Sequence, residues 1–273
     1  MSPGQAALKS VPFVKANGCG NDFLIVEEQY APPDNTSFTH RICDRHSGVG
    51  ADGVEWISVK AGQSDSHIAA RLVNADGSEA EISGNGTRCV AAYYVAQYGG
   101  EAVKVSTGAG VKTCTLIQHR ANQFEFEMNM GRPVFGGEKL LHFVSGPSVG
   151  FQVSMGNPHF VDWVKDFVFD WQSRGAEVQR QAAFPNGVNV EFVRVVDEHQ
   201  IEVRFFERGV GETKSSGTGS CAAVVAAIVA NKAFSPVTVA SEGGRQNVCW
   251  AGRDQDLFLT GPAQLVCRGE FFI

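Results

Sequence analysis

The chain carries one glycine-rich segment twice, once in each half. Residues 71–86 align without a gap with residues 204–219, and each copy continues through a cysteine into an alanine-rich apolar segment. Two weaker matches keep nearly the same spacing: residues 20–23 with 156–160, and residues 52–56 with 189–192. Matched segments in the same order predict a duplicated domain. Such a domain usually places its two copies of a site across one cleft, which suits a reaction on both faces of one atom.

The length and one apolar stretch constrain the fold. A chain of 273 residues is near the upper limit for one core and is comfortable as two domains of roughly 100–150 residues each. The stretch 221–230 is apolar all round, so a helix there has to be enclosed on every side. We therefore expect an α+β fold of two pseudo-symmetric domains, each a curved, mostly antiparallel sheet or barrel around a central helix. The expected domains are residues 1–127 with 263–273, and residues 128–262.

Charge and cysteine usage exclude several classes of protein. The formal net charge is −6, and no run of lysine or arginine occurs, so nucleic acid and anionic membrane surfaces are not expected partners. The N-terminal ten residues lack a basic region followed by an apolar stretch, and no apolar run is long enough to span a bilayer. The seven cysteines include no CxxC pair, as is typical of reduced thiols. The expected location is cytoplasmic.

Each copy of the repeat has a glycine-rich loop directly before a predicted helix. The loops are residues 83–86 and 216–219, and the helices are expected at about 86–98 and 219–232. Serine is a favoured N-cap and glycine lets a ligand approach the backbone, so each loop offers amide hydrogens at the positive end of a helix dipole. For one copy, an ordinary glycine-rich cap is the simpler interpretation. Two copies in matching positions favour a site that holds a carboxylate from two sides.

Polar residues near these loops form a candidate site for an amino acid head group. Arg208 adds a cation to four asparagines at strand-to-loop transitions, although each asparagine alone is typical of a turn. His159 and Glu207 are candidate general acids and bases, because their protonation is tunable; the alternatives are a structural loop histidine and a partner of a nearby arginine. The other histidines show no ligand spacing, so no metal site is expected. The four asparagines are Asn21, Asn74, Asn157 and Asn189.

Taken together, these motifs resemble the diaminopimelate epimerases, a family of amino acid epimerases that need no pyridoxal phosphate. The similarity covers nearly the whole chain and rests on residues 20–23, 43–46, 48–53, 74–79, 84–86, 155–159, 189, 207–209 and 217–219. It implies two pseudo-symmetric domains with a small amino acid substrate between them, no cofactor and a homodimer. It also implies these substrate-binding residues: Asn21, Asn74, Gly84, Asn85, Asn157, Asn189, Arg208, Gly217 and Thr218.

The resemblance further implies a catalytic cysteine immediately before each glycine-rich loop, where one thiolate removes the α-proton and the opposite thiol delivers another. This chain has Ser83 and Ser216 at those positions. A thiol has a pKa of about 8.5 that a helix N-terminus lowers, whereas a serine hydroxyl is almost never ionised at neutral pH. Serine alone is therefore a poor general base. Cys89 and Cys221 lie about one and a half turns further along their helices and are expected to point into the core as small hydrophobes.

Three interpretations follow from the serines. In the leading one, the chain is an epimerase that interconverts LL- and meso-diaminopimelate, a precursor of lysine and peptidoglycan, with Ser83, Ser216, His159 and Glu207 as its catalytic residues. In the second, it is a ligand-binding homologue without turnover, or a racemase or isomerase that acts on another amino-acid-like substrate through His159 or Glu207. In the third, the serines are deliberate substitutions that trap a substrate.

Overall fold

The computed structural model describes residues 8–60, 65–143 and 146–273. The chain forms two compact units, one from Met1–Phe126 with Ala263–Ile273 and one from Glu127–Pro262. No helix within the described ranges is long and apolar enough to cross a membrane. The expectation that the N-terminus carries no secretory signal depends largely on residues 1–7, which lie outside the described residues.

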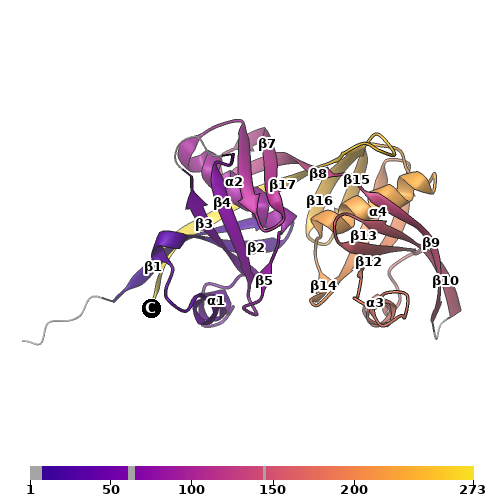
Figure 1. Cartoon of the computed structure of the whole chain (residues 1–273), viewed down its shortest axis with the longest axis horizontal. Helices are drawn as coiled ribbons and strands as arrows, with labels where there is room; N and C mark the ends of the chain where they lie inside the picture. The colour runs from indigo at the N-terminus through magenta and orange to yellow at the C-terminus, as the bar shows by residue number, and fades with distance from the viewer. Residues whose placement is uncertain (1–7, 61–64, 144–145) are drawn as a thin grey trace, which may run out of the picture. The chain divides into compact units, whose positions relative to one another are not determined.

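Unit 1 is a mostly antiparallel sheet that packs against the long helix α2 (Figure 1). Its strands follow the order β17–β1–β2–β3–β4–β6–β7, and only the pairs β2–β3 and β4–β6 are parallel. Helix α2 contacts six of these strands, whereas α1 contacts β3 and β4. The elements are β1 Ser10–Gly18, β2 Asn21–Glu27, the 3-10 helix η1 Glu28–Tyr30, α1 Asn35–Cys43, β3 Gly53–Val59, β4 Ile68–Asn74, β5 Glu79–Ala80, α2 Gly84–Tyr98, β6 Ala102–Thr107 and β7 Gly110–Arg120.

Unit 2 repeats this plan around helix α4. Its strands follow the order β9–β10–β11–β12–β13–β15–β16–β17, and the parallel pairs β11–β12 and β13–β15 fall where unit 1 has its own two. This agreement confirms the predicted α+β fold of two related units. The elements are β9 Val134–Phe143, β10 Gly146–Ser154, β11 Pro158–Trp163, α3 Trp171–Gln179, β12 Asn189–Asp197, β13 Gln200–Glu207, β14 Gly211–Thr213, α4 Gly217–Val229, β15 Val237–Ser241 and β16 Gly244–Trp250. Two strands have residues in both units: β8 Gln123–Gly131 and β17 Leu257–Phe272.

Helix α4 is enclosed by its sheet, as its apolar sequence requires. Residues 221–227 are all completely buried, and strands β10, β11, β12, β13, β15 and β16 contact the helix. Cys221 belongs to this core, and Cys89 is equally buried in α2. The expectation that both cysteines point away from solvent is confirmed.

Both central helices begin two residues earlier than predicted. Ser83 and Ser216 are the N-caps, and their Oγ atoms accept hydrogen bonds from the amides of Gly86 at 3.1 Å and Gly219 at 3.2 Å. The capped glycines therefore form the first helical turn instead of a preceding loop.

Helix α3 and strand β9 were not predicted. Helix α3 has a local signal, because the Asp170 side chain accepts a hydrogen bond from the Ser173 amide at its start. Strand β9 alternates exposed and partly buried residues around the glycine pair 136–137, and such glycines resemble a loop in the sequence.

Strand β17 provides a direct test of the unit 2 core. Leu259 is completely buried in the core around α4, whereas the adjacent Phe258 is 37% exposed on the other face of the strand. Leu259→Ala should lower the free energy of unfolding by about 2–5 kcal/mol, because it leaves a cavity. Phe258→Ala is the matched control and should cost less than about 1 kcal/mol. Urea unfolding measures the free energy of unfolding of both variants. Equal losses would contradict the placement of Leu259 and Phe258 on opposite faces of β17.

The two serine caps should also contribute to stability. Ser83→Ala and Ser216→Ala each remove the acceptor of one first-turn amide and should lower the free energy of unfolding by about 1 kcal/mol. Threonine at either position keeps a hydroxyl acceptor and serves as the control, with a smaller expected loss. Denaturant titration at neutral pH compares the four variants. If alanine and threonine behave alike, the hydroxyls do not act as caps.

Candidate active site

In unit 1, the predicted site residues gather at the N-terminus of α2. The Asn85 side chain donates a hydrogen bond to Asn21 Oδ1 at 3.2 Å, and Asn21 donates to Asp52 Oδ2 at 2.6 Å. Asp52 Oδ2 also accepts from the Asp22 amide at 3.0 Å. This chain of contacts joins the first turn of α2, where Ser83 is the cap, to the start of β2.

Asn74 occupies the end of β4, opposite Gly53 of β3. Its side-chain amide donates to Ser78 Oγ at 3.0 Å, and Ser78 donates in turn to Asp76 Oδ1 at 2.6 Å. Asn74 therefore belongs to the turn between β4 and β5.

The α2 N-terminus lies against a buried carboxyl that sequence analysis did not identify. Glu55 of β3 is only 3% exposed. A Cβ added at Gly86 would collide with Glu55 Oε1 and would lie 3.2 Å from Ser83 Cβ. The glycine therefore lets the carboxyl approach the first turn of α2 close to the serine. Burial raises the pKa of Glu55 to about 8.

In unit 2, a hydrogen-bonded chain runs from the α4 N-terminus into the interior. The Asn157 amide donates to Thr218 Oγ1 at 3.4 Å, and Asn157 Oδ1 lies 2.9 Å from His159 Nε2. His159 Nδ1 lies 2.7 Å from Glu191 Oε1, and both side chains are fully buried. Because Asn157 Oδ1 can only accept, Nε2 carries a proton. The remaining nitrogen and Glu191 therefore share a second proton between them.

Glu191 has the same relation to α4 that Glu55 has to α2. A Cβ added at Gly219 would lie 2.7 Å from Glu191 Oε1. Burial raises the pKa of Glu191, and the negative charge of Glu207 adds to that rise, while the His159 contact opposes it. Both glutamates occur in the weaker sequence match, residues 52–56 with 189–192. Their burial was the missing information, since a glutamate in a strand usually faces solvent.

Asn189 links the other predicted residues of unit 2. Its Oδ1 accepts from the Arg208 amide at 2.9 Å, and its Nδ2 donates to the Pro158 carbonyl at 3.1 Å. The guanidinium of Arg208 is exposed and donates to the Asn186 carbonyl at 3.1 Å. Glu207 is the last residue of β13, and its charge acts on Glu191.

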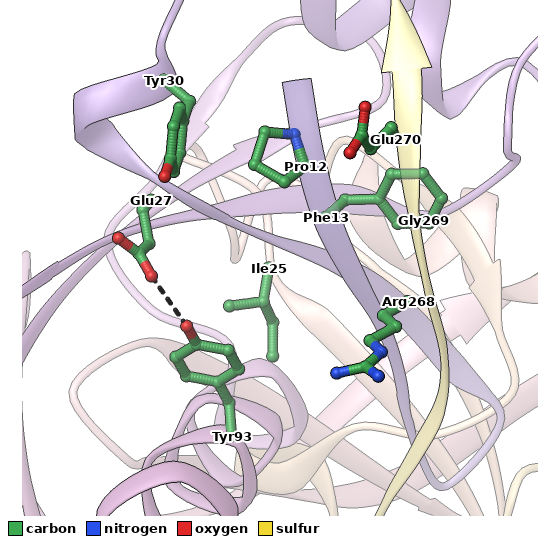
Figure 2. A pocket seen from close by; sticks show the side chains of 9 residues that line it. All are labelled: Pro12, Phe13, Ile25, Glu27, Tyr30, Tyr93, Arg268, Gly269 and Glu270. Carbon is green, nitrogen blue, oxygen red and sulfur yellow. Dashed lines mark hydrogen bonds between the residues drawn. The ribbon is translucent and has the colours of Figure 1, made fainter. Parts of the chain in front are cut away.

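A separate cavity of about 430 Å³ in unit 1 contains none of the predicted site residues (Figure 2). It is lined by strands β1, β2 and β17 with η1 and α2, and on its wall the Tyr93 hydroxyl donates to Glu27 Oε1 at 2.9 Å. The side chains on its wall include both apolar groups and charges of each sign. Its lining is Pro12, Phe13, Ile25, Glu27, Tyr30, Tyr93, Arg268, Gly269 and Glu270.

Within each unit, the structure thus combines first-turn amides, a serine cap and a buried glutamate. The first-turn amides suit a carboxylate, because they are donors at the positive end of a helix dipole. Unit 2 adds the His159–Glu191 pair, in which a proton can pass between the imidazole and the carboxyl without changing the net charge of the pair.

Solved structures of differently named proteins show the same fold. A hydroxyproline epimerase from Agrobacterium vitis matches with a TM-score of 0.73 at 13% identity, over 98% of this chain and 92% of that one. A Bacillus anthracis phenazine biosynthesis protein of the PhzF family matches with a TM-score of 0.72 at 15% identity, over 97% of this chain and 100% of that one. At such low identity these matches show the fold alone.

Sequence comparisons are more specific. The family model described as "Diaminopimelate epimerase" matches residues 13–136 and 151–266. A diaminopimelate epimerase of Halothermothrix orenii is 37% identical over 96% of this chain and 98% of its own length. One of Aromatoleum aromaticum is also 37% identical, over 96% and 98%. The matches run through both units and span nearly the full length of the relatives, so the chain belongs to the diaminopimelate epimerase family of isomerases.

Proposed function

We propose that this protein is a cofactor-independent epimerase that interconverts LL- and meso-diaminopimelate, and that it acts as a homodimer in the cytoplasm. The proposed substrate is that of the diaminopimelate epimerases that are 37% identical to this chain over nearly its whole length. The observation that supports the chemistry is the pair of equivalent helix N-termini, one in each unit, each with a serine cap and a buried glutamate.

In this proposal, both half-sites serve one substrate molecule. The first-turn amides of α2 and α4 bind the carboxylate of the reacting amino acid centre, because the N-terminus of a helix favours a negatively charged group. The side chains of Asn21, Asn85 and Asn157 supply neutral donors and acceptors, while Arg208 supplies a cation for bidentate recognition. Asn74 and Asn189 shape the strand ends that border these groups, and backbone approach occurs at Gly84, Gly217 and Thr218.

Epimerisation then requires one base and one acid on opposite faces of the α-carbon. The C–H bond breaks, its proton passes to a base in one unit, and the electron pair stays on the substrate. A hydroxyl of the other unit delivers a proton to the opposite face and a new C–H bond forms. We assign Ser83 and Ser216 as the groups that contact the α-carbon. We assign His159 and Glu207 the role of accepting or returning the proton of Ser216, as a base does for a serine nucleophile.

A second candidate function is ligand binding without turnover. Ser83 and Ser216 themselves favour it, because an unassisted serine hydroxyl is almost never ionised at neutral pH and is therefore a poor general base. A racemase or isomerase for another amino-acid-like substrate would keep the two half-sites and change the contacts to the distal side chain. α-Proton exchange distinguishes all three functions.

The proposed epimerase should exchange the α-proton of LL-diaminopimelate with solvent. In heavy water we expect slow deuterium incorporation at one α-carbon and accumulation of the meso form, followed by proton NMR. His159→Gln removes the proton-holding group of unit 2 and should reduce exchange at least about 100-fold. Binding measured by calorimetry without any exchange would instead support the ligand-binding function. Exchange with a different amino acid would reassign the substrate.

Introducing thiols at positions 83 and 216 should raise the rate of epimerisation. Ser83→Cys combined with Ser216→Cys should increase epimerisation by about 100-fold or more, because a helix N-terminus stabilises a thiolate. Each single substitution is the matched control and should give much less, since one face would still lack a competent group. A double variant that folds and binds diaminopimelate but does not turn over would overturn the assignment of these two positions to the α-carbon.

A further inference from the structure

The geometry points to Glu55 as a positioning residue that sets the charge at the unit 1 half-site: its neutral carboxyl leaves the α2 N-terminus available to an anion, and its ionisation weakens anion binding there. The inference rests on the proposed function only in taking the anion to be the carboxylate of diaminopimelate. Glu55 itself is not assigned contact with the substrate. It acts through the first turn of α2 and the Ser83 cap.

The position of Glu55 follows from strand alternation in β3. Its neighbour Trp56 packs against Phe38 of α1, with ring centroids 5.7 Å apart. Successive side chains of a strand point to opposite faces, so Glu55 faces α2 instead. The contact with Gly86 fixes the carboxyl beside the first-turn amides. Any residue larger than glycine at position 86 would displace it.

The groups that face Glu55 do not provide another titration in the same pH range. Directly across the sheet lie the apolar side chains of Ile25 in β2 and Leu72 in β4. Helix α2 contributes Arg88 and Cys89, and the Cys89 pKa is raised, mainly by burial and in part by the charge of Glu55. Arg88 donates to Asn85 Oδ1 at 2.5 Å.

The turn before β2 and the start of β2 supply further charged or titratable groups. The Cys19 thiol lies 3.9 Å from a guanidinium nitrogen of Arg88. Burial opposes ionisation of Asp22, but hydrogen bonds from Arg45 and Lys15 outweigh it and lower the Asp22 pKa. Asp22 is therefore ionised across the range in which Glu55 titrates.

The two half-sites differ in what balances the buried carboxyl. In unit 2, attraction to His159 opposes the effect of burial on Glu191, so a proton can move within the pair without changing its net charge. For Glu55, burial is the only cause of the raised pKa of about 8. Below that pH the carboxyl is neutral and the α2 dipole acts fully on a bound anion. Above it, a negative charge lies next to the same amides.

Binding of LL-diaminopimelate to the full-length protein between pH 6.5 and 9.5 tests this role. As the pH rises over this range, calorimetry should show that affinity falls at least about tenfold more in the native protein than in Glu55→Gln. Such a loss is expected when the ionised Glu55 carboxylate and the bound carboxylate lie a few ångströms apart. The comparison at each pH cancels titration of the ligand. Glu27→Gln removes another carboxyl of unit 1, one that accepts from Tyr93, and should keep the native pH dependence.

A second measurement does not depend on the proposed substrate. Carbon-13 NMR identifies the Glu55 carboxyl as the signal that is absent in Glu55→Gln. This carboxyl should titrate near pH 8. Sulfate should raise the pKa of Glu55, because an anion that binds better when Glu55 is neutral must in turn favour the neutral form. Parallel affinity curves for the native protein and Glu55→Gln, or titration of Glu55 near pH 4.5, would overturn the inference. If LL-diaminopimelate does not bind at all, the proposed function fails, and the sulfate shift alone decides: a rise supports the role of Glu55, and no rise rejects it.

Discussion

Enclosure of the two central helices by their sheets is the constraint on which the rest of the structure depends. Helix α4 has an entirely apolar body, so only its ends can meet polar groups. The first-turn amides of any helix lack hydrogen-bond partners within the helix. When such an amide is buried, leaving it without a partner costs free energy. Ser83 and Ser216 each satisfy one such amide. The other first-turn amides are donors at the positive end of a helix dipole, and the fold provides this arrangement twice.

The polar groups behind these helix ends explain how duplicated half-sites acquire different electrostatics. Each unit buries one glutamate against the glycine of the first turn. In unit 2 the His159 contact lets the buried carboxyl share a proton, whereas Glu55 is held neutral by burial alone at ordinary pH. The duplicated backbone therefore carries a proton-sharing pair in one unit and a single titrating carboxyl in the other.

Sequence patterns predicted the elements that have strong periodicity and missed those without it. The α+β class and both central helices were predictable, because apolar runs and turn residues mark them. The starts of α2 and α4 were placed two residues late, since the glycines after Ser83 and Ser216 look like loop residues until the caps are seen. Helix α3 and strand β9 were missed because their apolar periodicity is weak. Glu55 and Glu191 were missed because a sequence does not show that a strand is buried on both faces.

The sequence by itself determined the duplication, the family and the identities of the residues at the two helix N-termini. These depend on the order and spacing of residues, which a one-dimensional pattern records fully. Only the tertiary structure decided which polar groups meet: His159 with Glu191, Asn85 with Asn21, and Glu55 with the first turn of α2. These contacts join segments that are distant in the chain, and sheet register and burial fix them. The protonation of the site follows from that burial, because the free energy of a charge depends on its surroundings.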